Sequence, residues 1–146
     1  MFAHMSVIAA NSEDCMYSPE GKEPTKFAKE ELSFSKFINE NLFVGILSSG
    51  DYISVKYWTC DHFGLEANLF IPISEMNDGL IKEKILWLAS KVLAKKDSEI
   101  IRLYLSKLEK IKDGRIEIPH DMYSEFAVQI SSGQFSKTIS INFYFS

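Results

Sequence analysis

The segment that decides the fold is residues 78–112, which read DGLIKEKILWLASKVLAKKDSEIIRLYLSKLEKIK. Its first half carries apolar residues at steps of four, three and four, which places them on one stripe of an α-helix: Ile81, Ile85, Leu88 and Val92. Its second half carries another stripe, at roughly 130° around the axis from the first when each residue turns by about 100°: Ile101, Tyr104, Leu105, Leu108 and Ile111. A single straight helix would have to bury two faces. We therefore predict two helices that meet at residues 95–98, where Asp97 or Ser98 would cap the second.

Before this segment, the chain begins with a polar stretch that we predict to be irregular. Residues 1–24 contain Ser-Pro, Glu-Gly and Glu-Pro pairs, which favour turns and loops. Residues 26–41 are predicted as an N-terminal helix, because the apolar positions fall at i, i+7, i+10 and i+11: Phe27, Phe34, Phe37 and Ile38. Ser33 and Ser35 weaken that helix.

Elsewhere the apolar residues alternate with polar ones, which is typical of β-strands. The alternation predicts strands over residues 42–47, 52–59, 65–73, 115–118, 126–130 and 139–145, and the last strand is expected near the centre of the sheet. Gly50 is expected at positive φ in the first hairpin turn, Asn77 as a helix cap, and Gly114 at the end of the second helix. The predicted fold is α+β, a single domain of 1–146. It consists of an antiparallel sheet of about five to six strands packed against a central helical pair plus an N-terminal helix.

The net charge of −4 is distributed unevenly along the chain. Lys and Arg minus Asp and Glu give −3 for residues 1–41, −3 for 42–77, +3 for 78–114 and −1 for 115–146. The helical segment is basic and the strand segments are acidic. One interpretation is that the helices carry lysines on their surface for solubility and helix propensity. The other interpretation is that an acidic sheet face binds a basic partner. Sparse positive charge argues against a nucleic-acid partner.

Motifs for chemistry are weak. Neither the two cysteines nor the three histidines have metal-ligand spacing, no phosphate-binding loop is present, and no cofactor is expected. No signal peptide or apolar run of membrane-spanning length is visible, so a cytoplasmic protein is the default expectation. The remaining enzymatic hypothesis is a small hydrolase or nuclease that uses Cys60, His62 or His120.

The aromatic residues of the strands suggest a binding surface. Tyr52, Trp58, Phe70 and Tyr144 fall opposite the expected core sides of their strands, and they form an open aromatic face unless the N-terminal helix covers them. The leading hypothesis is a non-enzymatic protein of the immunity type, which neutralises a basic bacterial toxin such as a nuclease by binding it. A dimeric adaptor or chaperone-like subunit is the other alternative. The predicted interface residues lie on or beside strand ends: Asp51, Trp58, Asp61, Glu66 and Asp121.

Overall fold

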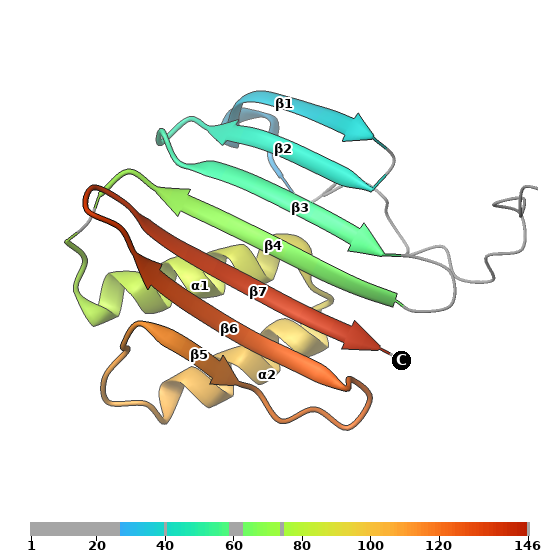
Figure 1. Cartoon of the computed structure of the whole chain (residues 1–146), viewed down its shortest axis with the longest axis vertical. Helices are drawn as coiled ribbons and strands as arrows, with labels where there is room; N and C mark the ends of the chain where they lie inside the picture. The colour runs from blue at the N-terminus through green and yellow to red at the C-terminus, as the bar shows by residue number, and fades with distance from the viewer. Residues whose placement is uncertain (1–26, 40, 59–62, 74, 146) are drawn as a thin grey trace, which may run out of the picture.

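The computed structural model describes residues 27–39, 41–58, 63–73 and 75–145. Within them the chain forms one antiparallel sheet with two helices packed on one of its faces (Figure 1). The strands follow the order β1-β2-β3-β4-β7-β6-β5 across the sheet. They are β1 (Leu32–Asn39), β2 (Leu42–Leu47), β3 (Tyr52–Trp58), β4 (Phe63–Ile71), β5 (Gly114–Glu117), β6 (Glu125–Ser132) and β7 (Lys137–Phe145).

The connections explain this order. The first four strands follow one another as hairpins, the chain then passes through both helices, and it returns to the sheet at the far edge as β5. The last strand, β7, fills the gap between β4 and β6. It pairs with β4 along nine residues, from Phe63 opposite Phe145 to Ile71 opposite Lys137. The expected place of the C-terminal strand near the centre of the sheet is confirmed.

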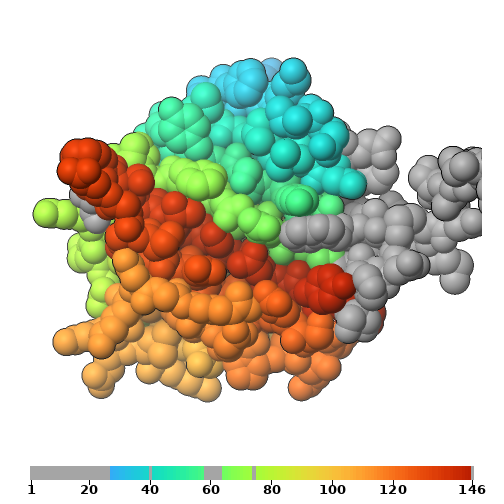
Figure 2. Space-filling model, viewed as in Figure 1, coloured from blue at the N-terminus to red at the C-terminus, as the bar shows by residue number. Residues whose placement is uncertain are grey.

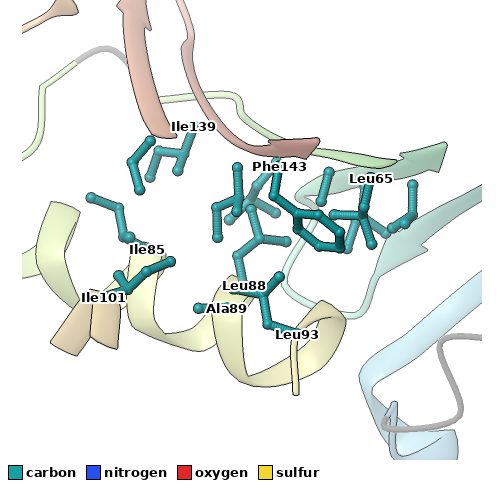
Figure 3. Close-up of a cluster of buried hydrophobic side chains, with 14 of the residues drawn as sticks. Leu65, Ile85, Leu88, Ala89, Leu93, Ile101, Ile139 and Phe143 are labelled. Carbon is teal, nitrogen blue, oxygen red and sulfur yellow. The ribbon is translucent and has the colours of Figure 1, made fainter. Parts of the chain in front are cut away.

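The helices are α1 (Asp78–Val92) and α2 (Lys95–Ser106). Their apolar stripes pack against the inward side chains of the central strands, as Figure 3 shows for Ile85, Leu88 and Ile101 below Ile139 and Phe143. All three helix residues are completely buried. Among the described residues, the sheet therefore has a covered face, against which the helices pack, and a second face that no described helix covers, which we call the open face.

The predicted break between the helices is confirmed, but its residues differ. Asn77 caps α1 as expected, since its side chain accepts a hydrogen bond of 2.8 Å from the backbone N–H of Leu80. The second helix starts after Ala94, without a side-chain cap. Asp97 is in the first turn of α2 and is buried, so it does not act as the predicted cap.

The end of the second helix was predicted too late. The helix stops at Ser106, and Gly114 opens β5 with a φ of 129° instead of terminating the helix. Ile111 still reaches the core from the segment between them. Ile111 therefore continued the helical spacing of apolar residues although it lies beyond the end of the helix. This spacing led to the prediction of a longer helix.

The predicted N-terminal helix is wrong, and with it the count of five to six strands. Residues 29–31 form a short 3-10 helix. Residues 32–39 form β1, which brings the number of strands in the sheet to seven. Pairing with β1 satisfies the backbone groups along the outer edge of β2, which a helix could not do. Phe37 then contacts Phe43 edge to face, with ring centroids 5.3 Å apart.

Candidate functional site

The open face of the sheet carries a row of large apolar side chains across its first four strands. Phe34 lies opposite Ile46, Ile46 opposite Tyr52, and Tyr52 opposite Phe70. Because side chains alternate along a strand, all four point away from the helices. The exposed fractions are 51% for Phe34, 51% for Tyr52 and 42% for Phe70. We call these four residues the aromatic row; Figure 2 shows the open face on which they lie, since the helices are behind the sheet in that view.

A polar network runs beside the aromatic row. The Asn68 side chain donates hydrogen bonds to Glu66 at 3.0 Å and to Ser54 at 3.4 Å, and its oxygen accepts one of 2.6 Å from Ser140. These four residues lie on β3, β4 and β7. The network fixes the orientation of Asn68 and Glu66, so a partner would meet polar groups that are already ordered.

The open face is not acidic. Its strands carry three basic and three acidic side chains: Lys36, Lys56, Arg115, Glu66, Glu117 and Glu125. Arg115 binds both Glu117 and Glu125, and the hydrogen bond that it donates to Glu117 is the main reason that the pKa of the guanidinium is raised. The prediction of an acidic sheet face is therefore wrong for the described strands. A count of charges along the sequence does not show whether a carboxylate at a strand end lies on the open face or on the side of the helices.

Asp51 illustrates this error. It follows the β2–β3 turn, whose Gly50 has the predicted positive φ of 94°. Its carboxylate is 6% exposed and accepts a hydrogen bond of 2.7 Å from Lys84 of α1. This predicted interface residue therefore binds the helix layer to the sheet instead of facing a partner.

The acidic groups of this end gather in a pocket between α1 and the β2–β3 turn. It has a volume of about 380 Å³ and is lined by Glu30, Glu31, Leu47, Ser48, Ser49, Glu83, Lys84 and Trp87. Lys91 donates a 2.7 Å hydrogen bond to Glu31, which lowers the pKa of that carboxyl. Glu30 and Glu83 are exposed and form no ion pair within the described residues. The pocket and the aromatic row share the β2–β3 turn, because Ile46 and Tyr52 flank the turn whose Ser48 and Ser49 line the pocket.

The other predicted interface residues are scattered. Glu66 is on the open face in the polar network, and Asp121 is exposed in the connection between β5 and β6. Trp58 ends β3, but its side chain is outside the described part of the chain. Asp61, Cys60 and His62 also lie outside the described residues. Of the predicted set, the described side chains of Asp51, Glu66 and Asp121 do not form one patch.

His120 belongs to a buried polar cluster. Its Nδ1 accepts hydrogen bonds from the backbone N–H groups of Met122 and Tyr123, at 3.1 and 3.3 Å, so the ring proton is on Nε2. Nε2 donates to Asp97 at 3.0 Å, and the Tyr123 hydroxyl donates to the same carboxylate at 2.7 Å. The His120 side chain is only 5% exposed. A substrate has no open approach to this imidazole, and the cluster instead joins α2 to the segment before β6.

Sequence reasoning missed this cluster because Asp97 and His120 are separated by 23 positions and neither lies in a recognisable motif. It also missed Phe34 as a surface residue, since the helix assignment placed that ring on a buried stripe. No group of three or more residues able to hold a metal ion is present among the residues that the structure describes. Within the same residues, neither helix is long and apolar enough to span a membrane.

Comparisons with known proteins found no match to this chain among family models, curated proteins or solved structures.

Proposed function

We propose that this chain is a non-enzymatic binding protein that docks a protein partner on the open face of its sheet. The observation that carries the proposal is the aromatic row, in which three rings each expose 42% or more of their surface. Tyr52 and Phe70 are directly opposed, and Ile46 lies between Tyr52 and Phe34. Contiguous exposed apolar surface of this kind is uncommon on proteins that have no partner. Aromatic side chains are also the residues that most often dominate binding energy at interfaces.

The partner is a basic protein, and the role is that of an immunity protein that neutralises a bacterial toxin in the cytoplasm. The support for positive charge on the partner is the pocket beside the row. There Glu30 and Glu83 line the same pocket as Trp87, and their carboxylates would attract a Lys or Arg side chain. The Trp87 ring already has the ammonium group of Lys91 at 5.8 Å from its centroid. A partner that lies over the aromatic row and reaches around the β2–β3 turn would meet both features.

The test is a binding measurement with the larger protein encoded by the neighbouring gene. Titration calorimetry with the full chain is expected to give tight binding, and Tyr52→Ala combined with Phe70→Ala is expected to weaken it about tenfold or more. The matched control is Leu103→Ala, because Leu103 is a similarly exposed apolar residue on α2, with 57% of its surface accessible. Unfolding in urea should show that each variant stays folded.

The charge of the partner is tested through the association rate. Glu30→Gln combined with Glu83→Gln is expected to slow association severalfold at low salt, and the difference is expected to shrink at about 0.5 M salt. A neighbouring gene product that does not bind, or one whose affinity is unchanged by the Tyr52 and Phe70 substitutions, contradicts the proposal. Rates that do not depend on the two glutamates would contradict the basic partner alone.

A further inference from the structure

The two edges of the sheet differ in how well they are protected. At one edge, β5 has only four residues, and its open-face side chains Arg115 and Glu117 are charged. Short length and charge are common ways in which proteins keep a sheet edge from pairing with another chain. At the other edge, β1 has eight residues and carries a single charged side chain, Lys36.

The outer edge of β1 is open within the described structure. Its only partner strand there is β2, and the seven residues after Leu32 are all exposed. Three of them are large and apolar, Phe34 at 51%, Phe37 at 37% and Ile38 at 55% exposure. The pairing with β2 is regular from Phe34 to Phe37 and shifts register on either side of that stretch. Between these two irregularities, residues 34–37 form a regular stretch of exposed edge four residues long.

We propose that β1 pairs antiparallel with β1 of a second copy of this chain, which joins two seven-stranded sheets into one. The two-fold axis passes through Ser35. This register places Phe34 of each copy opposite Lys36 of the other, on the open face, because directly opposed residues in an antiparallel pair share a face. Each ammonium group then lies beside an aromatic ring, which is a favourable contact.

Charge excludes an alternative register, and the pairing of Phe34 with Lys36 favours a second copy as the occupant. An axis through Lys36 would place two like charges directly opposite each other, which is destabilising. With the axis through Ser35, the one charged residue of β1 meets a ring that the partner already exposes. Both halves of each pair come from the same strand, so a second copy supplies the complement without any further sequence.

The size of the contact sets its expected strength. Even pairing along all eight residues of β1, which span about 27 Å, falls in the small class of interfaces, below about 1,200 Å². We therefore expect a dissociation constant in the micromolar range, on the order of 10 µM. This dimer uses the edge of the sheet. On the open face it engages Phe34 of the aromatic row and leaves Ile46, Tyr52 and Phe70 available to a partner.

Sedimentation equilibrium of the full chain tests the proposal. The apparent mass is expected to rise from 16.7 kDa towards twice that value as concentration increases from about 1 to 500 µM. Phe34→Lys should weaken dimerisation at least about tenfold, because it places like charges opposite each other at two points. The matched control is Phe70→Lys, which adds the same charge on the same face but three strands away from the edge.

A compensating substitution tests the register. Phe34→Lys combined with Lys36→Glu places a lysine opposite a glutamate twice, and it should restore dimerisation to within about threefold of the wild type. A wild-type chain that stays monomeric at about 500 µM overturns the proposal. Equal loss of dimerisation in Phe34→Lys and Phe70→Lys also overturns it, because the copies would then associate through their open faces. Failure of the double variant to dimerise, while circular dichroism shows it folded, overturns the register and with it the edge pairing proposed here.

Discussion

Replacing Asp97 with Asn should reveal how much stability the buried polar cluster supplies. The two oxygens of Asp97 accept hydrogen bonds from the Tyr123 hydroxyl and from His120 Nε2, at 2.7 and 3.0 Å. An Asn side chain offers one acceptor oxygen and presents an NH₂ group where the other oxygen was. One of the two donors then faces another donor at a site that is only 8% exposed.

The expected cost follows from this geometry. A hydrogen bond to a charged group contributes about 1.5–3 kcal/mol, and a buried donor left without an acceptor costs about 1–3 kcal/mol. One bond is lost and the other becomes neutral, so the free energy of unfolding should fall by about 2–3 kcal/mol. For a chain of 146 residues, that loss lowers the melting temperature by roughly 6–12 °C.

Urea unfolding followed by circular dichroism measures this loss, and an unchanged slope with denaturant would show that the unfolded state is not affected. Asp121→Asn is the matched control, because Asp121 is next to His120 in sequence but exposed. Its effect should stay within about 0.5 kcal/mol. Tyr123→Phe removes only one donor and should cost about 1 kcal/mol, with coupling to Asp97→Asn of at least about 0.5 kcal/mol. An Asp97→Asn protein that is as stable as the wild type would refute this account of the cluster.

Three further substitutions test other parts of the structure. Burial raises the pKa of Tyr57 to about 12 from 10.0, so its contribution to stability is complete below pH 10.0 and is lost as pH rises through 12. The wild type should therefore lose free energy of unfolding between about pH 9 and pH 12, and the Tyr57→Phe variant should lose about 2–3 kcal/mol less over the same range. Urea unfolding at each pH measures both values. Asp51→Asn should destabilise the chain by about 1–2 kcal/mol in the same assay while leaving partner affinity unchanged, because the carboxylate binds Lys84 within the fold. Gly50→Ala should cost about 1 kcal/mol through its φ of 94° alone, since no atom lies within 4 Å of the added methyl group; an unchanged melting temperature would contradict this.

The parts of the fold that the sequence predicts are those where burial is periodic. Ile53 and Val55 are buried on one side of β3, while Tyr52 is exposed on the other. The alternation of residue types along the strand predicted both sides. The two helices follow from stripes on different faces for the same reason. The side of the strand on which Tyr52 and Phe70 lie was predictable, but their exposure was not, because a predicted N-terminal helix could have covered them; residues 32–39 instead form β1.

The edge strand was not predictable in this way. A strand that is exposed on both faces has no reason to alternate, and seven consecutive residues of β1 are exposed. Phe27, Phe34 and Phe37 fall at helical spacing, but they have three different surroundings in the structure. Phe27 stacks on Phe43 at a centroid distance of 6.0 Å, Phe37 contacts the edge of the same ring, and Phe34 is at the surface. The helical spacing of these three phenylalanines therefore does not reflect burial on a common face.

The site depended on contacts between distant segments. The carboxylate of Asp51 and the ammonium group of Lys84 are 33 positions apart, and nothing local to the turn indicates that the carboxylate bends towards the helices. The same holds for Asp97 and His120. Predicting which carboxylates remain available to a partner required the arrangement of the layers, which sequence patterns did not supply.

The width of the two layers explains why apolar side chains remain exposed where they do. Seven strands spaced about 4.8 Å apart make a sheet roughly 29 Å wide, whereas two helices, each about 10 Å across, cover roughly 20 Å of it. The cover therefore ends before the β1 edge, and the opposite face has no helix at all among the described residues (Figure 1). Phe34 is on the open face and also on the edge strand that the helices do not reach. Exposed apolar edges and faces promote non-specific association unless something specific occupies them. A chain that keeps large apolar side chains at both positions is thus best explained if the face and the edge each have a defined occupant.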